Sequence, residues 1–79
     1  MMHLEIITPE KLLFAGDILL VKLPGTVGSF EMMENHAPII STLTIGQIKV
    51  KELNGTLSYF EIKGGIVEGS NNQVKVLVE

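Results

Sequence analysis

The sequence predicts an all-β fold, a small sandwich or barrel in one domain. Long stretches with the helical period of apolar residues are missing. Instead, short apolar or alternating runs end in turn-forming residues about every 8–12 positions, a spacing typical of all-β sandwiches and barrels. A chain of 79 residues has room for one domain with one modest core.

The first half of the chain contains four runs that we expect to form strands. A proline or a glycine ends each of the first three, because these residues favour turns and interrupt a strand ladder. The four runs are Leu4–Thr8 (ended by Pro9), Leu12–Ala15 (ended by Gly16-Asp17), Ile18–Leu23 (ended by Pro24-Gly25) and Ser29–Met32.

The second half continues the pattern. Gly64-Gly65 and Gly69 interrupt one apolar run, and we interpret the glycine pair as a bulge or a close approach of two backbones. Ser70–Gln73 is expected to form a turn. The remaining expected strands are Ile39–Thr44, Gln47–Leu53, Thr56–Lys63 and Val74–Val78.

Asn54-Gly55 is the clearest hairpin signal in the chain. A two-residue loop would place Ile48 opposite Glu61. A three-residue loop over Asn54–Thr56 places Ile48 opposite Ile62, which keeps apolar side chains on one face. Because a shift of one residue moves every side chain to the other face, burial favours the second register. That register also pairs Val50 with Phe60 and Lys49 with Glu61.

Composition limits the classes of function. The formal net charge is −3, and the six cationic side chains are all lysines. Nucleic-acid binding favours a basic stripe with aromatic residues between the charges, which the sequence lacks. With no cysteine and two histidines, neither a disulfide nor a closed structural metal site is expected. A domain this small is marginally stable alone, so we expect a protein partner, with no cofactor and no nucleic acid.

The chain shows no signal for membrane insertion or secretion. No apolar run approaches the ~20 residues of a transmembrane helix. The N-terminus lacks the basic region and the long apolar stretch of a signal peptide. We expect a soluble domain, in the cytosol or at a membrane surface.

No arrangement of residues is typical of an active site. His36 could act as a general base, but no serine lies in a Gly-x-Ser-x-Gly elbow. Glu31 and Glu34 would point to opposite faces of a strand, so we expect solvated charges. Pro24–Gly28 lacks the Gly-Lys-Ser/Thr of a phosphate loop and is expected to form a turn. We therefore expect no enzymatic activity of the chain by itself.

Three stretches together resemble the N-terminal domain of the epsilon subunit of F-type ATP synthases (the delta subunit in mitochondria). They are "PGTVGSF", "NHAPIISTLTIGQIKV" and "IKGGIVEGSNNQVKVLVE", and the opening "LEIITPEKLLFAGDI" also fits. The resemblance covers essentially the whole chain in one order. The chain departs from the family at Glu31 and Glu34, where many members have glycine and proline, and at Gly69, where valine is usual.

The resemblance implies a flattened β-sandwich of about ten short, mainly antiparallel strands in two sheets. It implies a non-catalytic subunit of the central stalk, or rotor, that links the gamma subunit to the polar loops of the c-ring and couples proton flow to ATP synthesis. The location would be peripheral, on the cytoplasmic side of the bacterial inner membrane. Many members continue into a C-terminal helical hairpin; over residues 1–79 we expect the sandwich domain without this hairpin.

The resemblance also places a subunit interface on the segment before the His-Ala-Pro motif. Ser29 occupies a position where some relatives carry a glutamate that faces the c-ring. Met32 or Met33 is expected to be an apolar anchor, although the residues alone equally allow one core and one surface methionine. The full expected interface is Ser29, Phe30, Glu31, Met32, Met33, Glu34 and His36.

Two other classes of protein are alternatives to a rotor subunit. A stand-alone small β-barrel binding module should show a basic or aromatic groove. A small hydrolase should show a polar constellation in a pocket. The sequence shows neither feature.

Overall fold

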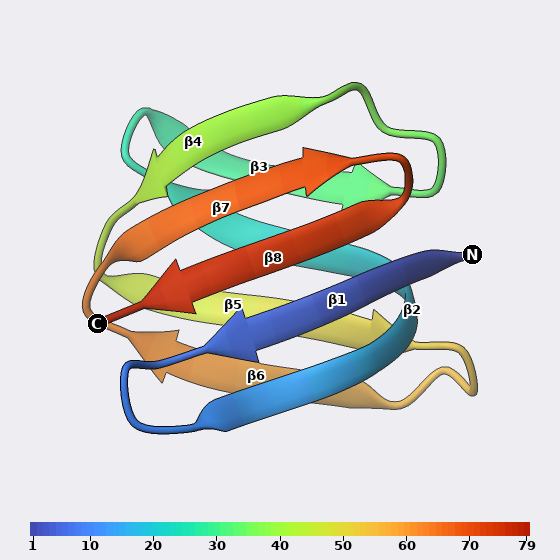
Figure 1. Ribbon diagram of the computed structural model, residues 1–79, viewed down its shortest axis with the longest axis horizontal. Helices are drawn as coiled ribbons and strands as arrows, with labels where there is room; N and C mark the ends of the chain where they lie inside the picture. Colours follow the sequence, from blue (N-terminus) through green and yellow to red (C-terminus); the bar gives the residue numbers. More distant parts are fainter.

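The computed structural model describes all residues from 1 to 79 and contains eight β-strands (Figure 1). No helix long and apolar enough to cross a bilayer is present. The strands, in chain order, are β1 (Met2–Ile7), β2 (Leu12–Gly25), β3 (Gly28–Met33), β4 (Ile39–Leu43), β5 (Gly46–Glu52), β6 (Leu57–Ile62), β7 (Gly65–Ser70) and β8 (Gln73–Val78).

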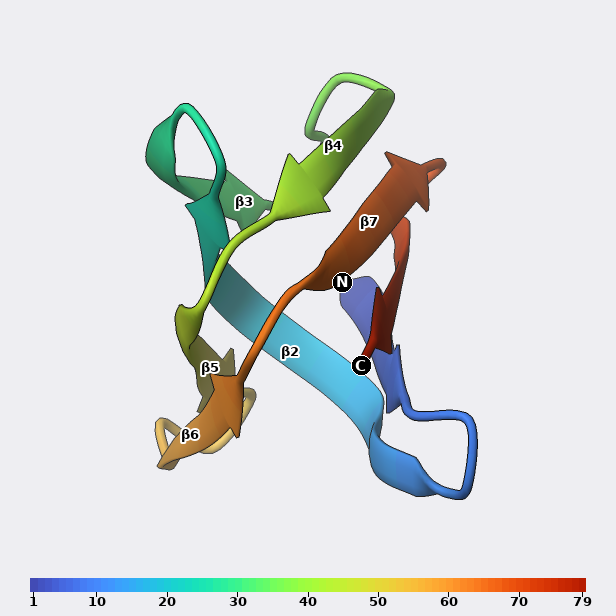
Figure 2. The same ribbon diagram turned by 90° about the vertical axis from the view of Figure 1, so that its left-hand side faces the viewer.

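The strands form a sandwich of two layers within 27 × 24 × 18 Å. One layer contains β4, β7, β8 and β1 with the first half of β2, and the other contains β3, β5 and β6 with the second half of β2 (Figure 2). Neighbouring strands are antiparallel except β1 and β8, which run parallel. The expected all-β sandwich is confirmed.

The structure has eight strands against about ten expected, and β2 is one continuous strand of 14 residues where two strands were expected. Gly16-Asp17 does not interrupt it, since both residues pair with β1, opposite Leu4 and His3. Beyond this point β2 leaves β1 and pairs with β5, with a register shift between Ile18 and Leu20. Such irregularities bend a strand, and this one lets β2 pass from one layer into the other. The two expected sheets are therefore one hydrogen-bonded sheet folded over itself.

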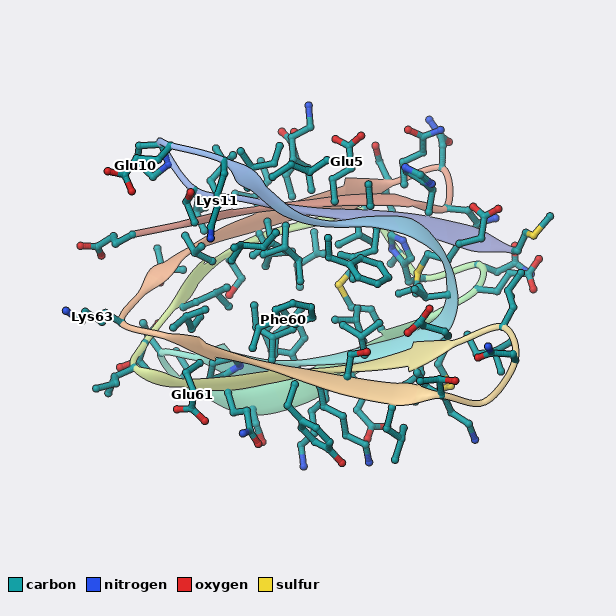
Figure 3. All side chains as sticks on the ribbon, turned by 90° about the horizontal axis from the view of Figure 1, so that it is seen from below. Glu5, Glu10, Lys11, Phe60, Glu61 and Lys63 are labelled. Carbon is teal, nitrogen blue, oxygen red and sulfur yellow. The ribbon has the colours of Figure 1, made fainter.

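Strict alternation of side chains fills the space between the layers. In β8, for example, Val74, Val76 and Val78 are buried and the residues between them are exposed. Figure 3 shows the ring of Phe60 between the layers, whereas Glu61 points away from them. The fifteen buried core residues are Met2, Leu4, Ile6, Ile18, Val21, Leu23, Met32, Leu43, Ile48, Val50, Ile62, Val67, Val74, Val76 and Val78.

The β5–β6 hairpin has a three-residue loop, as expected, but one residue earlier than expected. The loop is Leu53–Gly55, and Ile48 pairs with Phe60 instead of Ile62. Gly55 has φ of 89° and follows a turn closed by its N–H, which donates to the carbonyl of Glu52 (2.9 Å). This is a turn followed by a left-handed glycine, a common three-residue hairpin. Compared with the expected register, the partner of each β5 residue on β6 is shifted by two positions, so the same face of the hairpin is buried.

The expected partners of the other two pairs change in the same way. Val50 lies opposite Ser58 instead of Phe60, and Lys49 lies opposite Tyr59 instead of Glu61. The carboxylate of Glu61 instead accepts a hydrogen bond from the side-chain amide of Gln47 (2.8 Å). The expected lysine–glutamate pair of this hairpin is therefore absent.

Two asparagines turn the chain between β7 and β8, as expected for Ser70–Gln73. Asn71 and Asn72 have φ of 52° and 59°, and Ser70 pairs directly with Gln73. Positive φ at both central residues defines the tight turn that matches the twist of a hairpin, and asparagine tolerates it. The turn holds the β7–β8 register.

Gly65 lies where two backbones meet, as the glycine pair suggested. A Cβ atom at this position would collide with the Leu77 carbonyl oxygen and lie 3.1 Å from the Cα of Val78. Backbone atoms in a paired strand cannot move aside cheaply. The close approach of β7 and β8 therefore requires glycine.

We expect Gly65→Ala to destabilise the domain by about 1–3 kcal/mol, because the added methyl forces β7 and β8 apart. Gly16→Ala is the matched control, since its Cβ would meet only the Phe14 ring at 3.6 Å, an ordinary contact. Urea unfolding followed by circular dichroism measures both. Equal stability of the two variants would contradict the close approach.

The alternation of β3 separates the two methionines of the expected interface. Met32 is 3% exposed and lies in the core, whereas Met33 is 55% exposed on the outer surface. β3 pairs with β2 so that Met32 lies opposite the buried Val21. The two side chains therefore have different roles, although they are adjacent in the chain.

We expect Met32→Asp to unfold most of the protein, because an unpaired buried carboxylate costs at least about 3 kcal/mol, a large part of the stability of a small domain. Met33→Asp should change the free energy of unfolding by less than about 0.5 kcal/mol. Thermal unfolding of both variants checks this. A folded Met32→Asp protein would show that the β3 register differs from the one described.

Candidate protein–protein interface

The expected interface residues on β3 fall on two sides of the strand. Ser29, Glu31 and Met33 are exposed on the outer face of the second layer. Phe30 points inward and packs against the core, next to the buried Met32. Met32 is thus not available as a surface anchor, and Met33 is the methionine that a partner could contact.

The loop after β3 is tied to other parts of the domain. The carboxylate of Glu34 accepts a hydrogen bond from the N-terminal amine of Met1 (2.8 Å), in an ion pair with both groups more than half exposed. The backbone N–H of Asn35 donates to the side-chain oxygen of Asn72 in the β7–β8 turn (2.6 Å). Asn35 has φ of 66°, a left-handed conformation that asparagine tolerates. These contacts give the loop one defined position.

His36 fills the space between this loop and β7. Its Nδ1 lies 3.0 Å from the Ala37 carbonyl oxygen, which can only accept, so Nδ1 is the donor. Its Nε2 is buried and makes no hydrogen bond. The expected role of His36 in holding the loop agrees with this geometry.

Gly69 makes room for His36 and Met32. A Cβ atom at Gly69 would lie 2.7 Å from the Met32 methyl and 2.9 Å from the His36 ring carbon Cε1. Glycine at this position therefore has a local cause: the methionine and the histidine occupy the volume that a larger side chain would need.

The outer face of the second layer carries a cluster that no motif in the sequence indicated. Lys22 of β2 lies directly opposite Lys49 of β5, and Lys49 lies opposite Tyr59 of β6. Lys51 is in the next row, opposite Leu57. We call this cluster of Lys22, Lys49, Lys51, Leu57 and Tyr59 the basic face. The alternation of the hairpin would have placed its β5 and β6 members on one face, but Lys22 joins them only through the β2–β5 pairing.

The outer face of the first layer carries an apolar strip. Ile66 of β7 pairs with Leu77 of β8, which in turn lies beside Ile7 of β1. Ile40 of β4 is 68% exposed and lines, with Ile66 and Leu77, a shallow depression of about 200 Å³. Leu12, opposite Ile7, extends the strip to β2. Both outer faces thus present apolar side chains to a partner.

A second, more polar depression of about 380 Å³ includes His3, Glu5 and Ser70. The His3 ring nitrogens face carboxylates, with Nδ1 at 3.3 Å from Asp17 and Nε2 at 3.7 Å from Glu5. The hydrogen bond of the His3 ring is to Asp17, and none joins the ring to Ser70, whereas nucleophilic catalysis would require such a contact. No group of three His, Asp or Glu side chains is arranged to hold a metal ion.

Comparison with known sequences gives a consistent family. Residues 1–79 match the family described as "ATP synthase, Delta/Epsilon chain, beta-sandwich domain". Three relatives carry the name ATP synthase epsilon chain. One from Campylobacter fetus is 42% identical over 98% of this chain and 60% of its own length. One from Chlorobium limicola is 37% identical over 96% of this chain and 86% of its own length. One from Caulobacter vibrioides is 35% identical over 99% of this chain and 90% of its own length.

Solved structures share the fold at low sequence identity. A chain of the mitochondrial ATP synthase of Euglena gracilis superposes with a TM-score of 0.92 at 14% identity, over 98% of this chain and 49% of that one. A chain of the Tetrahymena thermophila mitochondrial ATP synthase central stalk and c-ring superposes with a TM-score of 0.81 at 18% sequence identity, over 98% of this chain and 62% of that one. This likeness concerns the fold, whereas the sequence matches establish kinship. The chain belongs to the ATP synthase delta/epsilon chain β-sandwich family.

Proposed function

We propose that the chain is a non-catalytic central-stalk subunit of a proton-translocating ATP synthase, linking the gamma subunit to the c-ring. The observation that carries this proposal is the match over the whole chain to proteins named ATP synthase epsilon chain, two of which it covers over 86% and 90% of their length. Torque passed between gamma and the ring would couple proton flow to ATP synthesis. The domain would lie peripherally, on the cytoplasmic side of the bacterial inner membrane.

The physical properties of the domain suit a connector between two partners. Its 48 backbone hydrogen bonds, 40 of them within the strands, form a rigid body that can transmit force. Its outer faces both carry exposed apolar residues, and its depressions are shallow and open at the surface. A rigid, two-sided domain can contact one partner on each side.

The contact with these partners would include the exposed residues of β3 and the loop after it. Met33 would be the apolar anchor, with Ser29, Glu31 and Glu34 as its polar surroundings. Ser29 is exposed but too short to form an ion pair, and Glu31, on the same face, is the carboxylate nearest along the strand. His36 would act indirectly, because its ring holds the loop in position.

The test is native mass analysis of the chain mixed with the gamma subunit from the same organism, with and without the c-ring. We expect a one-to-one complex with gamma. Met33→Asp should weaken assembly by about tenfold or more, because it places a charge at a desolvated contact.

Leu53→Asp, at a similarly exposed leucine in the β5–β6 loop, is the control and should assemble normally. Equal assembly of both variants and the unchanged protein would remove Met33 from the interface. A chain that stays monomeric with gamma and with the ring would contradict the central-stalk function itself and favour a stand-alone binding module.

A further inference from the structure

We propose that Asn54 is a site of spontaneous deamidation, and that opening of the β5–β6 hairpin sets the rate of this reaction in the folded protein. Asn54-Gly55 is the clearest hairpin signal of the sequence, and it lies outside the residues of the proposed interface. Deamidation at this loop is independent of the proposed rotor function.

The reaction needs only groups of this loop and one water molecule. The backbone nitrogen of Gly55 attacks the side-chain carbonyl carbon of Asn54, its proton passes to the side-chain nitrogen, and ammonia leaves. Water then opens the resulting five-membered imide at one of its two carbonyls, which gives aspartate or isoaspartate. Either product adds one negative charge, so the formal net charge changes from −3 to −4. Isoaspartate also lengthens the main chain of the loop that sets the β5–β6 register.

The residue after Asn54 makes it the most reactive asparagine of the chain. Glycine has no Cβ atom to hinder the attack, and its backbone is free to bring the nitrogen to the side chain. Asn54 and Gly55 are both exposed, so water can reach the imide. The other asparagines, Asn35, Asn71 and Asn72, precede histidine, asparagine and glutamine, whose side chains hinder the same attack.

The closed hairpin holds both reacting groups with hydrogen bonds. The N–H of Gly55 donates to the carbonyl oxygen of Glu52 (2.9 Å), so the attacking nitrogen is part of the turn. The Oδ1 atom of Asn54 accepts from the N–H of Thr56 (2.9 Å), which fixes the orientation of the side-chain amide. The nitrogen and the amide must be released before they can react, so the folded loop delays deamidation.

The β5–β6 hairpin is a part of the sheet that can open without unfolding the rest. β6 is the last strand of the sheet and pairs only with β5, and the loop between them projects from one end of the sandwich (Figure 1). The hydroxyl of Ser58 donates to the carboxylate of Glu52 (3.1 Å) and so closes the loop end of the hairpin. Local openings of this kind cost less free energy than global unfolding.

Two serine variants provide a matched experiment on the full chain. Ser58→Ala removes the hydrogen bond beside the loop. Ser41→Ala is the control, because its hydroxyl bonds only to the neighbouring Thr42 carbonyl in β4 (3.3 Å). Each protein is kept in mildly alkaline buffer, without urea, with urea below the unfolding transition, and fully unfolded in urea. Peptide mapping by mass spectrometry measures aspartate and isoaspartate at position 54, and hydrogen exchange of the Gly55 amide measures opening of the turn.

We expect the unfolded chain to deamidate first at Asn54, to both products. The folded protein should react at least about tenfold more slowly, since its rate follows the fraction of open hairpins. Ser58→Ala should react about two- to tenfold faster than the unchanged protein when folded, the effect of one lost hydrogen bond on opening, and at the same rate when unfolded. Ser41→Ala should match the unchanged protein in both states.

The rate of deamidation and the exchange of the Gly55 amide should rise together in urea below the transition, which tests the unchanged protein without any substitution. Equal rates in the folded and unfolded chains would overturn the proposal, because the turn would then not hold the reacting groups. An unfolded chain that reacts first at another asparagine would also overturn it. Faster exchange of the Gly55 amide with no faster deamidation would show that hairpin opening does not set the rate.

Discussion

The passage of β2 through both layers is the constraint on which the rest of the structure depends. Its first half pairs with β1 and its second half with β3 and β5, so one strand supplies the centre of both sheets. Two separate small sheets would each leave an apolar face in water, which a domain of this size cannot tolerate. Folding one continuous sheet over itself lets all fifteen core side chains meet in one space.

The surface that would contact a partner follows from the same pairing. β3 hydrogen-bonds to the second half of β2, and the register sets Met32 against Val21 in the core. Because strand side chains alternate, Glu31 and Met33 must then point outward. The inward side of β3 also fixes the loop that follows, since Met32 packs with His36 over Gly69. One side of β3 thus packs in the core, and its other side is exposed to a partner.

Several exposed features contribute nothing to the fold. Lys22 and Lys49 are like charges on neighbouring strands, with Glu31 on the other side of Lys22, and the apolar strip around Ile66 and Leu77 exposes side chains that would be more stable covered. A protein that functioned alone would gain from replacing both. Their presence on opposite outer faces is physically consistent with a domain held between partners in a larger assembly.

Local sequence determined the all-β class, the positions of most strands and the turns at Gly55 and at Asn71-Asn72, because alternation and turn residues act over a few positions. Tertiary structure decided the rest. Pairing with β1 carried β2 through Gly16-Asp17 against the local turn signal. The register of the β5–β6 hairpin, by contrast, was set by the local geometry of its turn, because alternation left two registers that bury the same face. Alternation alone does not determine which side chains of β3 face the core, because pairing with β2 decides this. Neither the burial of Met32 nor the basic face could therefore be predicted from the sequence, since the residues involved meet only through pairing of strands that are far apart in the chain.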